Sequence, residues 1–314
     1  MAAAFVFPGQ GSQVVGMGKG LAEAFPAARL VFEEVDAALG ERLSDLIWNG
    51  PADRLTLTEN AQPALMAVSL AALRALEEEA GIDLKRDAAF VAGHSLGEYS
   101  ALAAARSFSI ADAARLLRTR GRAMQKAVAV GAGAMAALIG LELDDVKAIA
   151  AEVKSIGVCA AANDNGGGQV VLSGAKAAVE QAVELAKLRG AKRAMMLTVS
   201  APFHCPLMQP AAEVMAEALA KVSVKPPIVP LVANVLAWPI TEPAEIVRCL
   251  VEQVTGTVRW RESILFMARS GVTDFYEIGA GKVLTGLIKR IAETAAAAAI
   301  GTPDDLTRFT AARG

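Results

Sequence analysis

Residues 88–106 read Ala-Ala-Phe-Val-Ala-Gly-His-Ser-Leu-Gly-Glu-Tyr-Ser-Ala-Leu-Ala-Ala-Ala-Arg. An apolar run at 88–92 ends at Gly93, and a helical pattern begins near Leu96, so the Gly-X-Ser-X-Gly motif at 93–97 lies between a strand and a helix. Glycines permit the strained turn that leaves the hydroxyl of Ser95 exposed at the helix N-terminus. The stretch predicts a nucleophile elbow with Ser95 as the nucleophile; the alternative is a chance pentapeptide in which Ser95 caps a helix.

A serine hydroxyl needs a general base, because it hardly ionises at neutral pH. The chain has two histidines, His94 and His204. Neighbouring side chains at a sharp turn diverge, so we expect His94 to be an orienting residue. His204 lies in a loop bracketed by prolines at 202 and 206, and a rigid loop can carry a side chain into a cleft. We therefore interpret His204 as the base, with a purely structural histidine as the alternative.

Two glycine-rich loops could be mistaken for nucleotide-binding motifs. Residues 8–13 read Pro-Gly-Gln-Gly-Ser-Gln, which lacks the spacing of a dinucleotide loop, and the loop at 279–283 lacks that of a P-loop. The first loop follows an apolar run at 3–7. It is better placed to aim the backbone N–H of Gln10 at the same oxyanion as the N–H of Leu96.

The fold class follows from the order of apolar runs and helical patterns. Runs at 3–7, 88–92, 228–232 and 274–278 predict strands, and helical periodicity covers about 17–38, 59–79, 96–106 and 109–128. Strands that alternate with helices indicate an α/β protein with a parallel sheet covered on both faces.

The pattern changes between 131 and 198. Strand signals at 134–141, 158–163, 169–173 and 191–199 enclose helical patterns at 144–154 and 176–188, which is the βαββαβ order of the ferredoxin-like motif. We expect an inserted small subdomain at 131–198, with the large subdomain formed by 1–130 and 199–314.

Composition excludes several classes of protein. Lys and Arg total 31 against 33 Asp and Glu, so no basic excess indicates a nucleic-acid partner. The three cysteines are far apart, which favours reduced thiols over disulfides or a metal site. The N-terminus does not resemble a signal peptide, and no segment is uninterrupted and apolar enough to span a bilayer. We expect a cytoplasmic protein with no membrane partner.

With these residues in view, the chain resembles the malonyl-CoA:acyl carrier protein transacylases. The resemblance rests on Phe-Pro-Gly-Gln-Gly-Ser-Gln at 7–13, Asn-Ala-Gln-Pro-Ala at 60–64, the elbow string at 93–102 and Gly-Ala-Gly-Lys-Val-Leu at 279–284. It implies a hydrolase-like domain with a ferredoxin-like insert. It also implies transfer of malonyl from malonyl-CoA to Ser95 and then to the phosphopantetheine thiol of an acyl carrier protein. Such an enzyme feeds fatty acid or polyketide synthesis and needs no cofactor or metal.

The resemblance also assigns the remaining site residues. Arg120 matches the arginine that clamps the malonyl carboxylate, although by sequence alone it could belong to a basic helix face with neighbouring arginines. Gln253 matches the position whose main-chain carbonyl supports the base, although 255–258 departs from the expected Asn-Pro-Val form. Gln62 and Asn163 are expected to line the site. Phe203 precedes the base, and an aromatic residue at this position resembles the sequence of the malonyl-selective members of the family.

Two rival functions remain open at this stage. One is a hydrolase, such as a thioesterase, that passes the acyl group to water. The other is a non-catalytic nucleotide- or carrier-binding module. A carboxylate clamp at Arg120 would argue against the first, and the combination of elbow and His204 argues against the second.

Overall fold

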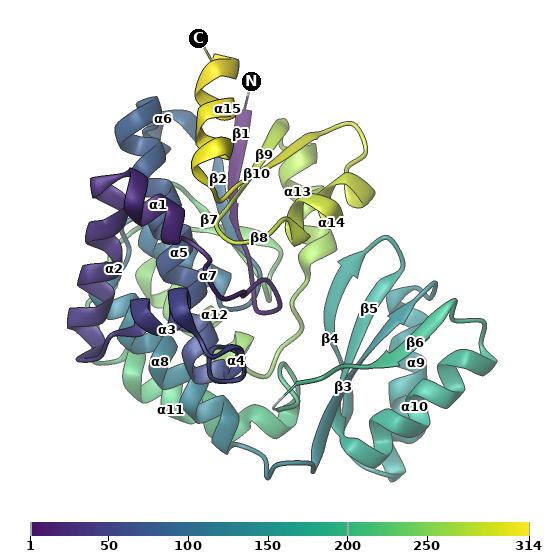
Figure 1. Cartoon of the computed structure of the whole chain (residues 1–314). Coiled ribbons are helices and arrows are strands. Elements are labelled where there is room, and N and C mark those ends of the chain that lie inside the picture. Colours follow the sequence, from purple (N-terminus) through teal and green to yellow (C-terminus); the bar gives the residue numbers. More distant parts are fainter. Residues whose placement is uncertain (1, 200, 314) are drawn as a thin grey trace.

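The computed structural model describes residues 2–199 and 201–313; residues 1, 200 and 314, which fall in the predicted large subdomain, lie outside the described residues. Figure 1 shows a large sheet surrounded by helices and a smaller sheet beside it. The strands are β1 (Ala2–Phe7), β2 (Phe90–Gly93), β3 (Gly133–Ile139), β4 (Cys159–Gly166), β5 (Gln169–Ala175), β6 (Arg193–Met196), β7 (Leu231–Ala233), β8 (Trp238–Ile240), β9 (Val272–Ile278) and β10 (Ala296–Ile300). The helices are α1 (Lys19–Ala24), α2 (Pro26–Leu39), α3 (Leu43–Asn49), α4 (Ala52–Thr56), α5 (Thr58–Ala80), α6 (Leu84–Asp87), α7 (Gly97–Ala104), α8 (Ile110–Lys126), α9 (Leu143–Glu152), α10 (Lys176–Leu188), α11 (Gln209–Leu219), α12 (Pro243–Gln253), α13 (Trp260–Arg269), α14 (Val283–Ile291) and α15 (Pro303–Arg313).

The large sheet has the strand order β10-β9-β1-β2-β7-β8, and all of its pairs are parallel except β7 with β8. Side chains alternate between its faces. Phe5 and Phe7 of β1 pack into a core that includes α2, α5, α7 and α8, while Ala4 and Val6 pack against α13 and α14. Burial on both faces explains the continuous apolar runs, and it confirms the predicted α/β class.

The second sheet is antiparallel, with the order β4-β5-β3-β6. One face packs on α9 and α10 through a separate core. On the other face, Met135, Ala162 and Val171 belong to the core of the large sheet. The small sheet therefore presents one face to its own helices and the other to the rest of the molecule, as Figure 1 shows.

The segment after α12 is hydrogen-bonded to strand β4 of the small sheet. Val258 N–H donates to the carbonyl of Ala162 at 2.8 Å, and Asp164 N–H donates back to the carbonyl of Val258 at 2.9 Å. Arg261 pairs with the buried carboxylate of Asp164 at 2.8 Å. The segment 255–258, which departs from the expected sequence form, therefore lies where the small sheet is held beside the end of α12.

Two local predictions need revision. The expected helix at 17–38 is two helices, α1 and α2, because Phe25 before Pro26 adopts an extended backbone at φ −126° and ψ 118°. The Ala-rich stretch at 295–299, for which the sequence predicted no element, falls almost entirely within strand β10. It pairs in parallel with β9, so tertiary contacts override the preference of alanine for helices.

The turn between β2 and α7 is packed too tightly for side chains at its glycines. A Cβ atom on Gly97 would lie 2.2 Å from the carbonyl oxygen of Phe7, and one on Gly93 would lie 1.9 Å from the backbone of Gly97. Both contacts are shorter than any real Cβ contact. Gly97 is therefore required because the start of α7 lies directly against the end of β1, and Gly93 because the turn folds α7 back against the end of β2.

We predict that Gly97→Ala destabilises the fold by about 1–3 kcal/mol or more, because the methyl group overlaps backbone that cannot move away easily. Gly286→Ala is the matched control: Gly286 lies inside α14 with open space around its missing Cβ. It should stabilise the protein by about 0.5–1 kcal/mol. Denaturant unfolding of both variants checks this, and equal stabilities would contradict the packing argument.

Candidate active site

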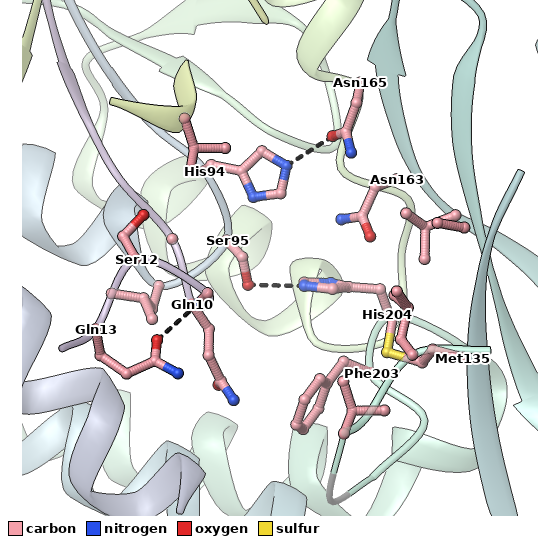
Figure 2. Close-up of a pocket in the computed structure, with 18 of the residues that line it drawn as sticks. Gln10, Ser12, Gln13, His94, Ser95, Met135, Asn163, Asn165, Phe203 and His204 are labelled. Atoms are coloured by element: carbon pink, nitrogen blue, oxygen red, sulfur yellow. Dashed lines mark hydrogen bonds between the residues drawn. The ribbon is translucent and has the colours of Figure 1, made fainter. Parts of the chain in front are cut away.

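Ser95 and His204 meet across the cleft although they are far apart in sequence. Ser95 follows β2 with a left-handed backbone, φ 52°, and His204 lies in the loop before α11 with φ 57°. The Oγ atom of Ser95 is 2.7 Å from Nε2 of His204, as Figure 2 shows. Left-handed conformations are costly for residues with side chains, so the surrounding packing holds both residues in place.

The hydrogen bonds of His204 define its tautomer. Its Nδ1 lies 2.8 Å from the main-chain carbonyl oxygen of Gln253, which can only accept. Nδ1 must therefore carry the proton, which leaves Nε2 free to accept from the Ser95 hydroxyl. Burial lowers the pKa of His204 to about 3, and the charge of Arg120 acts in the same direction. His204 is neutral at physiological pH, as a general base must be.

His94 has different partners. Its Nε2 donates to Oδ1 of Asn165 on β4 at 2.9 Å, and Figure 2 shows the ring directed toward Asn165. Its ring also lies against that of Trp260, with 5.6 Å between centroids. Burial lowers the pKa of His94, so it too is neutral. The contact ties the elbow to the small sheet, in keeping with an orienting residue.

Arg120 lies beside Ser95 and is only 1% exposed. Its Nη2 donates to Ser95 Oγ at 3.2 Å, and its Nε has no hydrogen-bond partner among the described residues. Burial lowers its pKa. Of the neighbouring arginines that could form a basic face, Arg115 and Arg122 are more than half exposed, and each forms an ion pair with an acidic residue. Arg118 is buried but pairs with Glu41. Arg120 is thus not part of an exposed basic face.

Two glutamines hold the guanidinium of Arg120. Nη1 donates to Oε1 of Gln62 at 2.7 Å, and Nη2 donates to Oε1 of Gln253 at 2.9 Å. The approach of α8 to the start of α5 makes the first contact possible, since a Cβ on Gly121 would lie 2.5 Å from the Cα of Glu59. Both partners are uncharged, so a buried cation faces the cleft without a carboxylate in direct contact.

The cleft has a volume of about 420 Å³. All the predicted site residues line it except Gln253, which lies behind His204. Asn163 and Phe203 lie on either side of His204 in Figure 2. Gln10 belongs to the loop after β1, and the end of β1 from which this loop starts contacts the elbow, because His94 N–H donates to the carbonyl of Phe7 at 3.0 Å. Leu96 precedes the first residue of α7.

Sequence reasoning missed two buried residues behind the elbow, Asn234 and Glu98. The Oδ1 of Asn234 accepts from Ser95 N–H at 2.8 Å, and its Nδ2 donates to the carbonyl of Gly93 at 2.7 Å. Glu98 lies in the first turn of α7 and is fully buried. The only signals were an acidic residue at the head of an Ala-rich helix and a polar residue after the strand β7.

The described residues contain neither a candidate metal cluster nor a candidate membrane-spanning helix. Among them, no group of three or more His, Cys, Asp or Glu side chains could hold a metal ion. None of the described helices has both the length and the apolar character that a bilayer crossing requires.

Comparison with known proteins places this geometry in a family. Residues 4–307 match the model of the acyl transferase domain. The malonyl CoA-acyl carrier protein transacylase of Bacillus subtilis is 48% identical over 304 residues, which cover 96% of this chain and 94% of that protein. The crystal structure of an acyl-carrier-protein-S-malonyltransferase from Bartonella henselae is 59% identical, with a TM-score of 0.97 over 99% of both chains. A malonyl-transacylase solved in complex with a type II PKS acyl-carrier protein is 42% identical, with a TM-score of 0.95 over 99% of this chain and 100% of that one. The chain therefore belongs to the acyl transferase family and, within it, to the malonyl CoA-acyl carrier protein transacylases.

Proposed function

We propose that this chain transfers the malonyl group of malonyl-CoA to the phosphopantetheine thiol of an acyl carrier protein through a malonyl-Ser95 intermediate. Relatives carry that name, and one is solved with an acyl-carrier protein. The observation that carries the proposal is Arg120: a buried cation 3.2 Å from Ser95 Oγ, held by neutral partners. A substrate with a free carboxylate would supply the missing anion.

The first half-reaction uses the contact between Ser95 and His204. Nε2 of His204 takes the hydroxyl proton while Oγ attacks the thioester carbonyl carbon. The tetrahedral intermediate collapses, the C–S bond breaks, and His204 returns the proton to the departing sulfur of coenzyme A. In the second half-reaction His204 takes the proton of the carrier thiol, the thiolate attacks the malonyl ester, and Oγ recovers its proton. Each half-reaction leaves His204 neutral.

We assign the oxyanion of each intermediate to the backbone N–H groups of Gln10 and Leu96. Both residues line the cleft next to Ser95, on the β1 loop and at the start of α7. The helix N-terminus adds a favourable dipole there. Phe203 and Asn163 line the acyl pocket beside His204, and the bulk of Phe203 favours malonyl over branched acyl groups.

The malonyl carboxylate has a second effect on the base. The charge of Arg120 is one cause of the low pKa of His204. A bound carboxylate compensates that charge, so it raises the pKa of His204 and makes Nε2 a stronger base when the correct substrate is present. A neutral acyl group gives no such compensation. This electrostatic link favours malonyl in the chemical step as well as in binding.

The rival functions fit the site less well. A hydrolase for plain fatty acyl groups has no use for a buried arginine beside the nucleophile, and desolvating that arginine is costly. A non-catalytic module has no need of a hydroxyl at 2.7 Å from a neutral histidine. The acyl-transfer function uses both features.

Three further properties belong to the proposal. The protein supplies nucleophile, base and oxyanion donors, so the reaction needs no metal or bound redox cofactor, and the coenzyme A thioester enters as substrate. The enzyme works in the cytoplasm, for fatty acid or polyketide synthesis. The chain is divided into a large subdomain, 1–130 and 199–314, and an inserted one, 131–198, and the separate core under the small sheet supports this division.

Ser95→Ala should abolish the covalent malonyl adduct and leave the fold intact, because only the nucleophilic oxygen is removed. Intact mass spectrometry after mixing with malonyl-CoA measures the adduct, and release on adding carrier protein to the wild-type adduct measures the second half-reaction. An adduct of equal yield on Ser95→Ala would disprove the assignment of the nucleophile.

His204→Ala should slow acylation by about 10³-fold or more, since nucleophile and base act as a unit. His94→Ala is the matched control, because His94 also lies at the elbow but bonds to Asn165 instead of Ser95. We expect it to slow acylation far less. Rapid-quench measurements compare the acylation rates of the two variants. A larger loss of rate in His94→Ala than in His204→Ala would contradict the assignment of His204 as the base.

Arg120→Ala should reduce the ratio of malonyl to acetyl acylation rate constants by about 100-fold or more, because only malonyl has a carboxylate to leave unpaired. Arg120→Lys should recover part of this loss, since an ammonium group cannot form two parallel hydrogen bonds. Arg122→Ala is the control on the same helix, with an exposed side chain. A ratio that is unchanged in Arg120→Ala would place the carboxylate elsewhere.

A further inference from the structure

Glu98 is a buried carboxylate that the reaction does not use. It lies three residues after Ser95, it is fully buried, and it does not touch the cleft. Its Oε2 accepts from Nε2 of Gln253 at 2.8 Å and from the N–H of Asn234 at 3.1 Å. Its Oε1 has no hydrogen-bond partner among the described residues. A carboxylate in such a place is costly, so its contacts need an explanation.

Gln253, one of the two partners of Glu98, connects Arg120 with His204. The side-chain oxygen of Gln253 accepts from Arg120 at 2.9 Å, and its main-chain oxygen accepts from His204 at 2.8 Å. The side-chain nitrogen of Gln253 donates to Glu98 and, at 2.9 Å, to the carbonyl of Ser95. The side-chain nitrogen of Gln253 therefore faces hydrogen-bond acceptors, and its side-chain oxygen faces the guanidinium of Arg120.

This arrangement permits only one orientation of the Gln253 amide. A carboxylate can only accept, and a guanidinium can only donate. If the amide were reversed, its oxygen would face Glu98 and the Ser95 carbonyl, and its NH₂ group would face Arg120. Every one of these contacts would be repulsive. Glu98 is the charged member of the acceptors, with the Ser95 carbonyl and Oδ1 of Asn234, that hold the amide so that its oxygen is presented to Arg120.

The same carboxylate supports the elbow through Asn234. The N–H that Glu98 accepts belongs to the residue whose Oδ1 holds the Ser95 N–H at 2.8 Å. Burial raises the pKa of Glu98 to about 7, while the hydrogen bonds from Gln253 and Asn234 and the charge of Arg120 lower it. At pH 8, above this pKa, the ionised form of Glu98 predominates.

We propose that Glu98 is a positioning residue for substrate selection: it fixes the side-chain amide of Gln253 so that Oε1 holds Arg120 ready for the carboxylate of the acyl group. The proposal rests on the function proposed above. It makes selection of the carboxylated substrate depend on a residue that touches neither the substrate nor the reacting atoms.

Two substitutions distinguish this role from packing. Glu98→Gln keeps the shape but replaces an anionic acceptor with a neutral amide that can also donate, so the charge-assisted hydrogen bond that holds the Gln253 amide is lost. Glu98→Asp loses a methylene group but still only accepts. We expect Glu98→Gln to lower the malonyl-to-acetyl ratio of acylation rate constants at pH 8 by about tenfold, since a hydrogen bond to a charged group is lost. Glu98→Asp should lower the malonyl-to-acetyl ratio less than Glu98→Gln does. A packing role gives the opposite order, because glutamine is the better isostere.

The matched control is Glu277→Gln. Glu277 is another fully buried carboxylate, which accepts from the N–H groups of Leu284 and Thr285, away from Arg120. The substitution Glu277→Gln should lower the stability of the fold and leave the malonyl-to-acetyl ratio of acylation rate constants unchanged. The rate constants come from rapid-quench acylation with malonyl-CoA and acetyl-CoA, followed by intact mass spectrometry, and KM and kcat are separated for each substrate.

A double variant covers the case in which Glu98→Gln changes the whole site. In the background of Arg120→Ala, Glu98→Gln should not lower the ratio further, because its effect passes through Arg120. An additive loss, or a ratio better preserved in Glu98→Gln than in Glu98→Asp, overturns the role of Glu98 while leaving the transferase function in place. A wild type that shows no preference for malonyl-CoA counts against both proposals.

Discussion

A guanidinium buried without a carboxylate in contact is the constraint on which the site depends. Arg120 is 1% exposed, and its direct partners are the oxygens of Gln62, Gln253 and Ser95. Desolvating a cation costs several kcal/mol unless an anion or good acceptors compensate. The three oxygens compensate in part, which leaves the site most stable when an anion enters beside Ser95. Under the proposed function, substrate selection is a consequence of where the charge of Arg120 is buried.

The fold brings these partners together through close backbone contacts. Gly97 lets α7 start against the end of β1, and Gly121 lets α8 approach the start of α5. The first contact exposes Ser95 to the cleft, and the second sets Arg120 beside Gln62. The end of α12 then supplies Gln253, whose carbonyl orients His204 and whose amide holds Arg120. Gln253 therefore connects His204 with Arg120, and Glu98 is the charged acceptor that holds its amide.

Much of this could be predicted from local sequence, and the reason for each failure is physical. The elbow and the βαββαβ order were readable because glycine spacing and hydrophobic period are local signals. The pairing of Ser95 with His204 could be argued because the chain offers two histidines. Asn234 and Glu98 could not be found, since their importance comes from long-range hydrogen bonds that leave no periodic pattern. β10 was missed because its alanines take their conformation from β9.

The role of Arg120 is tested most directly by a crystal structure of the covalent malonyl adduct, trapped by soaking crystals with malonyl-CoA. We predict an ester on Ser95 whose free carboxylate lies about 3 Å from two nitrogens of the Arg120 guanidinium. The side chains of Gln62 and Gln253 should stay in place. An adduct whose carboxylate points to the cleft mouth, with Arg120 bonded only to the two glutamines, would contradict the claim that the buried cation selects the substrate.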